Sequence, residues 1–145
     1  MLLTFAVIII GTLFALRPLQ KNVFFLLYFA LMMGCAYAFE LKGFYFDPFS
    51  KQSLLMFLLL HSVLINLVTM MAYASDKKAA KKGDWRVPEI QLHLLELLGG
   101  SPGAFLSQKL FHHKTKKKSF QLSFLFVFAV QIVIVYYVLK MLRII

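Results

Sequence analysis

Residues 54–74 read LLMFLLLHSVLINLVTMMAYA, a run of 21 residues that contains no Asp, Glu, Lys or Arg. A transmembrane α-helix needs about 20 predominantly apolar residues to cross the hydrocarbon core of a bilayer. The whole chain has 145 residues and is 61% hydrophobic, whereas roughly 45–50% of a soluble domain is apolar. We therefore predict an all-α membrane protein in which this run is the clearest span.

Three further apolar runs surround it, at Met1–Leu16, Val23–Phe39 and Phe120–Leu139. The first is slightly short, but Arg17 can extend its reach by placing the guanidinium among the headgroups. Nothing basic precedes it, so we expect no cleaved signal peptide. Cys35 is the only cysteine, which excludes an intramolecular disulfide. The sequence thus predicts four transmembrane helices.

The stretch Ile90–Phe111 is different, because it carries His93, Glu96, Gln108 and Lys109 and is interrupted by Gly99-Gly100-Ser101-Pro102-Gly103. A Gly pair suits a helix C-terminus, and Ser101 before Pro102 suits an N-cap and a first helical turn. Pro88-Glu89 would start the first half in the same way. We predict two half-helices that form a broken, re-entrant or interfacial hairpin between the third and fourth spans.

The distribution of Lys and Arg supports a hairpin that returns to its own side. If this stretch crossed the membrane, nine of these residues would be inside and seven outside. If it re-enters, twelve are inside and only four are outside, namely Lys42, Lys51, Lys140 and Arg143. The positive-inside rule favours the second arrangement. We therefore expect both termini to lie outside the cytoplasm.

Three polar residues fall inside the predicted spans. His61 and Asn66 lie in the third span and Gln131 in the fourth. Ionisable groups in a span tend to face the bundle interior and to be functional. The alternative is a neutral His61 hydrogen-bonded between helices, and Gln131 could be its partner or that of Asn66. Trp85, Tyr136 and Tyr137 have the character of interface anchors.

Five motifs follow one another within residues 76–120. They are Asp76-Lys77-Lys78-Ala79-Ala80, Trp85-Arg86-Val87-Pro88-Glu89, Leu92-His93-Leu94-Leu95, Gly99-Gly100-Ser101-Pro102-Gly103-Ala104 and His113-Lys114-Thr115-Lys116-Lys117-Lys118-Ser119-Phe120. In order and spacing they resemble the bacterial domain-of-unknown-function 1294 family of small inner-membrane proteins, over about Leu54 to Leu139. The resemblance implies a multi-pass protein of the bacterial cytoplasmic (inner) membrane and implies no particular biochemical activity.

Some family members resemble fusions with a nucleic-acid-binding cold-shock domain, whereas this chain has apolar helices at the corresponding place, so nucleic acid is not an expected partner. We predict two parts of the chain. Residues 1–53 form two transmembrane helices that lie outside the resemblance. Residues 54–145 form the family-like membrane domain, which contains the basic cytoplasmic loops and the hairpin.

A first candidate site lies on the hairpin. Glu89, His93 and Glu96 are spaced i, i+4 and i+7, which puts them on one helical face. His112 and His113 end the second half-helix and would return near Glu89. Catalytic candidates are therefore His93, Glu96 and His113, and metal-ligating candidates are Glu89, His93 and His112. The alternative is a local polar pair of His93 with Glu96, with Glu89 complementing a helix N-terminus. No cofactor is implied.

A second candidate site is a basic cytoplasmic face able to bind anions, and its members come from both sides of the hairpin: Lys77, Lys78, Lys81, Lys82, Arg86, Ser101, Lys114, Lys116, Lys117 and Lys118. The alternative is that these charges only orient the protein. The leading hypothesis is a non-enzymatic membrane protein that binds anionic lipid, or a membrane complex or homo-oligomer, through this face. Two others stay open: a membrane enzyme acting on a lipid or isoprenoid substrate at the hairpin, and a small oligomeric transporter.

Overall fold

The computed structural model describes residues 23–45, 47, 50–111, 117–141 and 143. Within these residues the regular structure is entirely helical and contains no strand. The elements are α3 (Val23–Leu41), α4 (Lys51–Lys82), α5 (Glu89–Leu95), the π-helical turn η1 (Glu96–Gly100), α6 (Ser101–Phe111) and α7 (Lys118–Met141). The all-α fold class predicted from the apolar runs is confirmed for this part of the chain.

Three of these helices, α3, α4 and α7, are long and apolar enough to cross a membrane, judged by their length and composition alone. Each contains one of the predicted spans. The sequence predicted four, and the described residues hold three rather than four. The remaining predicted span, Met1–Leu16, lies outside the described residues.

Helix α4 has 32 residues and is therefore about 48 Å long, which exceeds the roughly 30 Å hydrocarbon thickness of a bilayer. It extends past the apolar run because Lys77 to Lys82 continue the helix with good helix formers. It ends at Gly83, whose φ of +73° places it in the left-handed region. The amide of Asp84 then donates to the carbonyl of Ala79 at 3.0 Å, as in a Schellman C-terminus.

The predicted break in the hairpin sequence falls at a single residue. Gly99 has φ +112° and ψ +1°, a conformation that side chains bearing a Cβ rarely adopt. Ser101 was expected to be an N-cap, and this is wrong. Its φ of −59° and ψ of −39° are helical, and its hydroxyl donates backward to the carbonyl of Glu96 at 3.3 Å. The helix is interrupted at Gly99 alone, so Ser101 is already inside the following helix.

Two other glycines of this motif permit close helix packing. A Cβ on Gly103 would lie 2.6 Å from the backbone oxygen of Asn66, and a Cβ on Gly100 would overlap the hydroxyl of Thr69. Both neighbours belong to α4. The glycines therefore let the backbone around the break lie directly against α4, as small residues do at helix interfaces in membranes.

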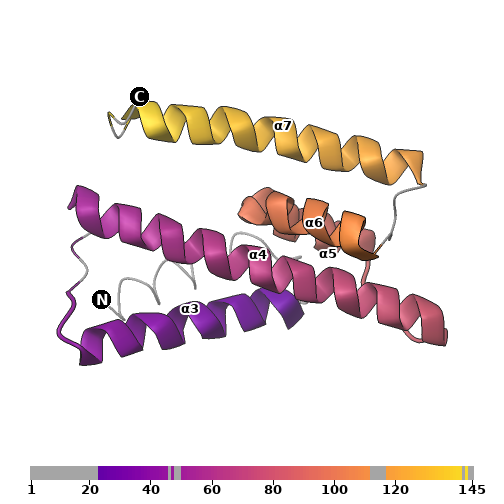
Figure 1. The fold of residues 1–145 in the computed structure, drawn as a ribbon, viewed down its shortest axis with the longest axis horizontal. Helices are drawn as coiled ribbons and strands as arrows, with labels where there is room; N and C mark the ends of the chain where they lie inside the picture. The colour runs from indigo at the N-terminus through magenta and orange to yellow at the C-terminus, as the bar shows by residue number, and fades with distance from the viewer. Residues whose placement is uncertain (1–22, 46, 48–49, 112–116, 142, 144–145) are drawn as a thin grey trace. The chain divides into compact units, whose positions relative to one another are not determined.

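The chain divides into two compact units, residues 1–64 and residues 65–145, with the boundary inside α4. In the second unit, α5, η1 and α6 lie between the second half of α4 and α7 (Figure 1). Its apolar core includes Ile65, Val68, Leu92, Leu95 and Phe120. The same core holds a set of buried polar side chains, which are Thr69, Asp76, Glu96, Ser101, Ser107 and Gln108. Burying polar groups in an apolar core is costly unless they are hydrogen-bonded, so this unit is where a functional site is expected.

Candidate functional site

Glu96 is the centre of the buried polar cluster. Its side chain has no solvent-accessible surface. The hydroxyl of Tyr73 donates to Oε1, and Nδ1 of His93 lies 2.7 Å from Oε2. Both carboxylate oxygens are therefore bonded inside the core, as a buried acidic group requires.

The cluster continues outward from Tyr73 and from the Glu96 backbone. The amide of Gln108 donates to the Tyr73 hydroxyl at 3.5 Å, and the amide of Gln121 donates to Oε1 of Gln108 at 2.8 Å. Gln131 donates to the backbone carbonyl of Glu96. We call this set the Glu96 network: Tyr73, His93, Glu96, Gln108, Gln121 and Gln131. Every helix of the second unit contributes to it.

His93 links the network to the surface. Its ring lies against Phe120, with centroids 4.5 Å apart and planes inclined by 31°, and its side chain is 17% exposed. Because Nδ1 contacts Glu96, Nε2 is the ring nitrogen left for an outside group; no described residue forms a hydrogen bond with it. A carboxylate at Nδ1 orients the ring and favours the tautomer that leaves Nε2 as an acceptor.

Two of the predicted catalytic residues are thus brought together, and the third, His113, lies outside the described residues. The predicted metal ligands are not assembled among described residues. Glu89 accepts from Nζ of Lys117 at 2.8 and 2.9 Å, His112 is outside the described residues, and no three His, Cys, Asp or Glu in the described part of the chain gather to hold a metal ion.

The intramembrane polar residues pair differently from the prediction. Gln131 binds the Glu96 carbonyl, so its expected pairing with His61 or Asn66 is wrong. His61 instead lies 2.6 Å from the hydroxyl of Tyr28, through Nδ1. Both partners of that pair belong to the first unit.

Asn66 bridges the two sides of the break at Gly99. Its Nδ2 donates to the carbonyl of Gly99 at 3.2 Å, and its Oδ1 accepts from the amide of Gly103 at 2.6 Å. These backbone groups have no partner within a regular helix, because the helix is interrupted there. A single side chain of α4 therefore satisfies both ends of the interruption.

The loop after α4 is held by Asp76, which is buried. Its carboxylate accepts from the guanidinium of Arg86 at 3.2 and 3.3 Å and from the amide of Val87 at 3.1 Å. The hydrogen bond to Asp76, together with its negative charge, raises the pKa of Arg86. Between these anchors Trp85 is 93% exposed, so the loop presents this indole outward.

Two contacts show that lysines from before α5 and from after α6 lie at the same end of the second unit. Lys77 donates through Nζ to the carbonyl of Phe111, the last residue of α6. Lys117, just before α7, pairs with Glu89 at the start of α5. The end of α4, the start of α5, the end of α6 and the start of α7 therefore share one end of this unit.

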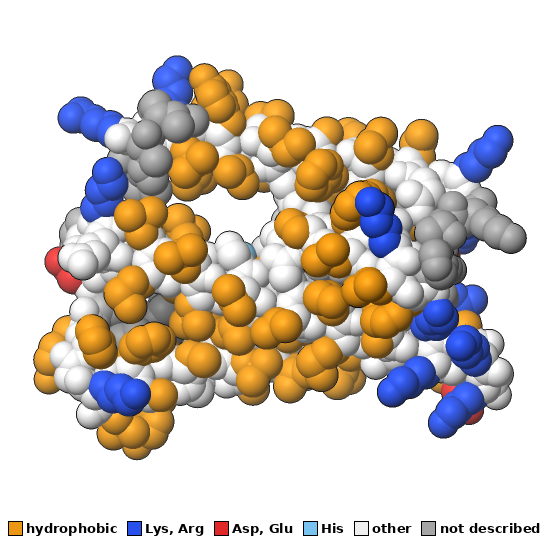
Figure 2. Space-filling model, viewed as in Figure 1, with side chains coloured by type: hydrophobic (Ala, Val, Ile, Leu, Met, Phe, Trp, Pro, Cys, Tyr) orange, Lys and Arg blue, Asp and Glu red, His pale blue; other side chains and the backbone are white. Residues whose placement is uncertain are grey.

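Lys78, Lys81, Lys82 and Lys118 are exposed at this end, and Figure 2 shows Lys and Arg side chains gathered over the C-terminal end of α4 (lower right). With Arg86 these four residues form what we call the basic surface. Ser101, predicted to belong to the same face, is fully buried. Lys114 and Lys116 lie outside the described residues.

Sequence reasoning missed several members of these sites. Tyr73 and Asp76 were not assigned roles, and Gln108 was noted only as an interruption of an apolar stretch. The one signal that could have found them was spacing: Asn66, Thr69, Tyr73 and Asp76 follow a helical three-to-four-residue repeat, which places the polar residues of α4 on one stripe.

Fold and site together define an all-helical protein with helices of membrane-spanning length and a polar network buried between them. Residues 66–120 match the family described as "Protein of unknown function (DUF1294)". This match confirms the resemblance predicted from the five motifs, over a shorter stretch than the predicted Leu54–Leu139.

The chain is also similar to "Uncharacterized protein YsdA" of Bacillus subtilis (strain 168), with 39% identity over 59 residues. That alignment covers 41% of this chain and 66% of the relative, so the chain spans just under two thirds of the relative's length. No solved structure matches the chain.

Proposed function

We propose that this protein is a multi-pass protein of the bacterial inner membrane that binds anionic phospholipid headgroups through the basic surface. The observation that carries the proposal is the convergence of four helix ends at one end of the second unit, where Lys77 meets Phe111 and Lys117 meets Glu89. That convergence collects lysines from both sides of the hairpin at one place.

The proposed topology has four spans, with α5, η1 and α6 entering the membrane and returning to the cytoplasmic side. Asn66, which binds both sides of the break, precedes Lys82 by 16 residues in α4. This corresponds to about 24 Å along the helix, which supports a hairpin tip well inside the hydrocarbon region. With this topology the positive-inside rule holds, and both termini are outside the cytoplasm.

The proposed ligand follows from the charge and exposure of the basic surface. A Lys or Arg beside an anionic membrane surface contributes about 1 kcal/mol to the attraction. Lys77 and Lys117 are engaged with protein groups, so the exposed Lys78, Lys81, Lys82 and Lys118 are the residues that would meet headgroups. Trp85, exposed in the same loop, suits the membrane interface.

The single tryptophan gives a direct test. The full chain is reconstituted in phosphatidylcholine vesicles that contain either brominated phosphatidylglycerol or brominated phosphatidylcholine, and quenching of Trp85 fluorescence is measured. We expect stronger quenching by the anionic lipid, reduced to the level of the zwitterionic lipid by the combined variant Lys78→Gln, Lys81→Gln and Lys82→Gln. The control is Lys140→Gln with Arg143→Gln, which should leave the preference unchanged. Equal quenching by both lipids in the unaltered protein would exclude the proposal.

A second candidate function is a membrane enzyme acting on a lipid or isoprenoid substrate. The observation that favours it is the contact of His93 Nδ1 with Glu96 at 2.7 Å, which leaves Nε2 as a proton acceptor in the manner of a general base. The test compares His93→Gln with Gln91→Ala, on the same helix. Lipid extracts from cells that express each protein are compared by mass spectrometry. A product that depends on His93 but not on Gln91 supports this function, and identical extracts count against it.

A further inference from the structure

A cavity of about 350 Å³ lies in the first unit, between the end of α3 and the first part of α4. It is lined by Ala36, Phe39, Phe44, Tyr45, Ser53, Met56, Phe57, Leu59, Leu60 and Val63. The volume is in the range of pockets that bind small molecules. This cavity is separate from the Glu96 network and the basic surface, all of whose residues belong to the second unit.

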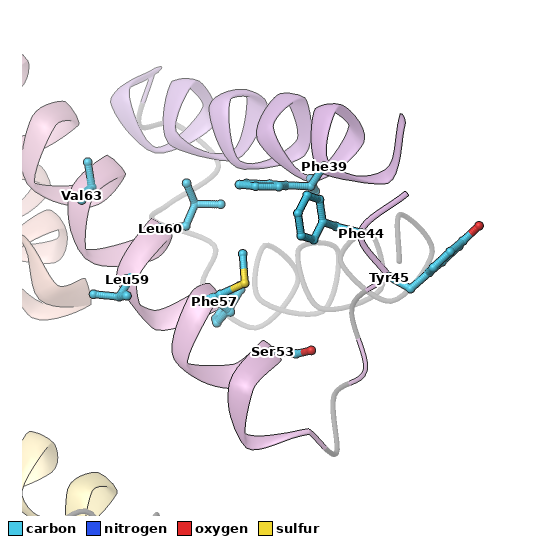
Figure 3. A pocket seen from close by; sticks show the side chains of 10 residues that line it. Phe39, Phe44, Tyr45, Ser53, Phe57, Leu59, Leu60 and Val63 are labelled. Carbon is cyan, nitrogen blue, oxygen red and sulfur yellow. The ribbon is translucent and has the colours of Figure 1, made fainter. Parts of the chain in front are cut away.

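The turn after α3 builds one wall. Gly43, with φ +79°, reverses the chain, and the amide of Phe44 donates to the carbonyl of Phe39 at 3.1 Å. The two rings then meet edge to face with centroids 5.9 Å apart. Figure 3 shows these rings side by side, Leu60 directed toward Phe39 from α4, and Tyr45 directed away.

The side chains that line the cavity are almost all apolar, which disfavours binding of a polar ligand. Apart from the hydroxyl of Ser53 and that of Tyr45, it offers only apolar side chains. The hydroxyl of Ser53 already accepts from the amide of Asp47 at 3.3 Å. Along α4 the lining residues extend from Ser53 to Val63, which is about 15 Å parallel to the helix axis. An apolar site of this length beside α4 fits an extended hydrocarbon chain that runs along the helix.

The charges near the Ser53 end indicate the headgroup that such a chain would carry. The stretch 40–53, which ends at Ser53, contains Lys42 and Lys51 together with Glu40 and Asp47, so its formal charges cancel. One carboxylate oxygen of Glu40, next to Phe39 in α3, is buried without a hydrogen-bond partner in the described residues. A buried acceptor calls for a donor. Mixed charges of this kind complement a headgroup that bears a phosphate and an ammonium group, in contrast to the uniformly positive basic surface.

We propose that this cavity binds one acyl chain of a zwitterionic phospholipid as a resident lipid, with its phosphate beside Lys42 and Lys51 and its ammonium group beside Glu40 and Asp47. The lipid is held by burial of its chain among Phe39, Phe44 and Leu60, and selected by its headgroup. It exchanges with the bilayer more slowly than the lipids that contact the exposed faces of the helices.

The first test uses a substitution, Leu60→Trp, that fills the cavity with a larger side chain. The full chain is reconstituted with an equal mixture of phosphatidylethanolamine and phosphatidylglycerol, purified in mild detergent, and its retained lipid is measured by mass spectrometry. We expect retained phosphatidylethanolamine, lowered about tenfold by Leu60→Trp, the factor for losing burial of about two methylene groups. Leu67→Trp, on an exposed position of the same helix outside the cavity, is the matched control and should retain the lipid. Equal retention by both variants, or preferential retention of phosphatidylglycerol by the unaltered protein, would overturn the proposal.

The second test needs no substitution and so does not depend on a variant's folding. Phosphatidylethanolamine with a photoactivatable group near the middle of one acyl chain is incorporated into the same membranes and irradiated, and its attachment sites are mapped. The proposal expects attachment concentrated in residues 53–63 and 36–44. Attachment spread evenly over exposed apolar residues, including Ile132 to Tyr137 of α7, would mean that the cavity holds no resident lipid.

Discussion

His93 and Glu96 are joined through the imidazole Nδ1, which lies 2.7 Å from the carboxylate Oε2 of Glu96 while the other carboxylate oxygen accepts from Tyr73. The carboxylate is completely buried and the imidazole is partly exposed. The pair therefore connects the interior of the second unit to its surrounding medium. Tyr73 lies on α4 and His93 on α5. Because Glu96 contacts both side chains, it also links these two helices.

Replacing Glu96 should destabilise the protein strongly. Glu96→Ala leaves the Tyr73 hydroxyl and His93 without their partner in the core, and each such loss costs about 1–3 kcal/mol. Glu96→Gln keeps an acceptor for Tyr73 and should cost less. The free energy of unfolding is measured by circular dichroism in mixed detergent micelles.

Glu89→Gln is the matched control, because Glu89 is the first residue of α5, the helix that carries His93, but forms an exposed pair with Lys117. Exposed pairs contribute about 0–1 kcal/mol. If Glu89→Gln destabilised the protein as much as Glu96→Ala, the buried network would not be the source of the stability.

Alanine substitutions at the two glycines after the break, Gly100 and Gly103, should change the stability of the protein in the opposite direction from an alanine substitution at Gly34 in α3. Gly100→Ala and Gly103→Ala each force a methyl group against α4, and overpacking of this kind costs about 1–3 kcal/mol. Gly34, inside α3, has no neighbouring atom within 4 Å of the place that a methyl group would occupy, so Gly34→Ala should stabilise its helix by up to about 1 kcal/mol. Thermal unfolding of the three variants tests this ordering, and a destabilised Gly34→Ala with unaffected hairpin variants would contradict it.

Asp76 should control the rigidity of the loop that carries Trp85. Asp76→Asn removes the negative charge that holds Arg86, so we expect trypsin to cleave after Lys82 or Arg86 severalfold faster in reconstituted protein. Asp84→Asn is the control, since its exposed side chain lies in the same loop and leaves Asp76 intact. Equal cleavage rates in the two variants would show that Asp76 does not hold the loop.

The proposed topology predicts which positions share a side of the membrane. In a Cys35→Ser background, which has no other cysteine, Lys81→Cys and Lys118→Cys should react with an impermeant thiol reagent from the same side. Lys42→Cys should react from the opposite side. Labelling of Lys81→Cys and Lys118→Cys from opposite sides would remove both the re-entrant hairpin and the single basic surface.

The helices themselves were predictable, because an uncharged apolar run of about 20 residues has few alternatives to a span. The break near Gly99 was also predictable, since paired glycines interrupt helices. Among the partners of the polar residues, the local pair of His93 with Glu96 was also predictable from its spacing, but the long-range partners were not. Glu96 and Tyr73 are 23 residues apart, and nothing in local spacing tells which of several polar groups on α4 or α7 a hairpin residue will meet. Ser101 was misassigned for a related reason: a serine before proline can cap a helix, but here the interruption lies at Gly99 and Ser101 is already helical.

In the proposed re-entrant topology, the bridge from Asn66 to Gly99 and Gly103 has a consequence for the order in which the chain enters the membrane. The carbonyl and the amide at the break would each cost several kcal/mol if exposed to hydrocarbon, and the group that satisfies both belongs to α4. The segment from Glu89 to Phe111 is therefore unable to insert alone. With that topology, α4 is already embedded when this segment emerges from the ribosome, and α4 would serve as the template on which the later segment folds. Biogenesis and final architecture are in this way linked through a single carboxamide.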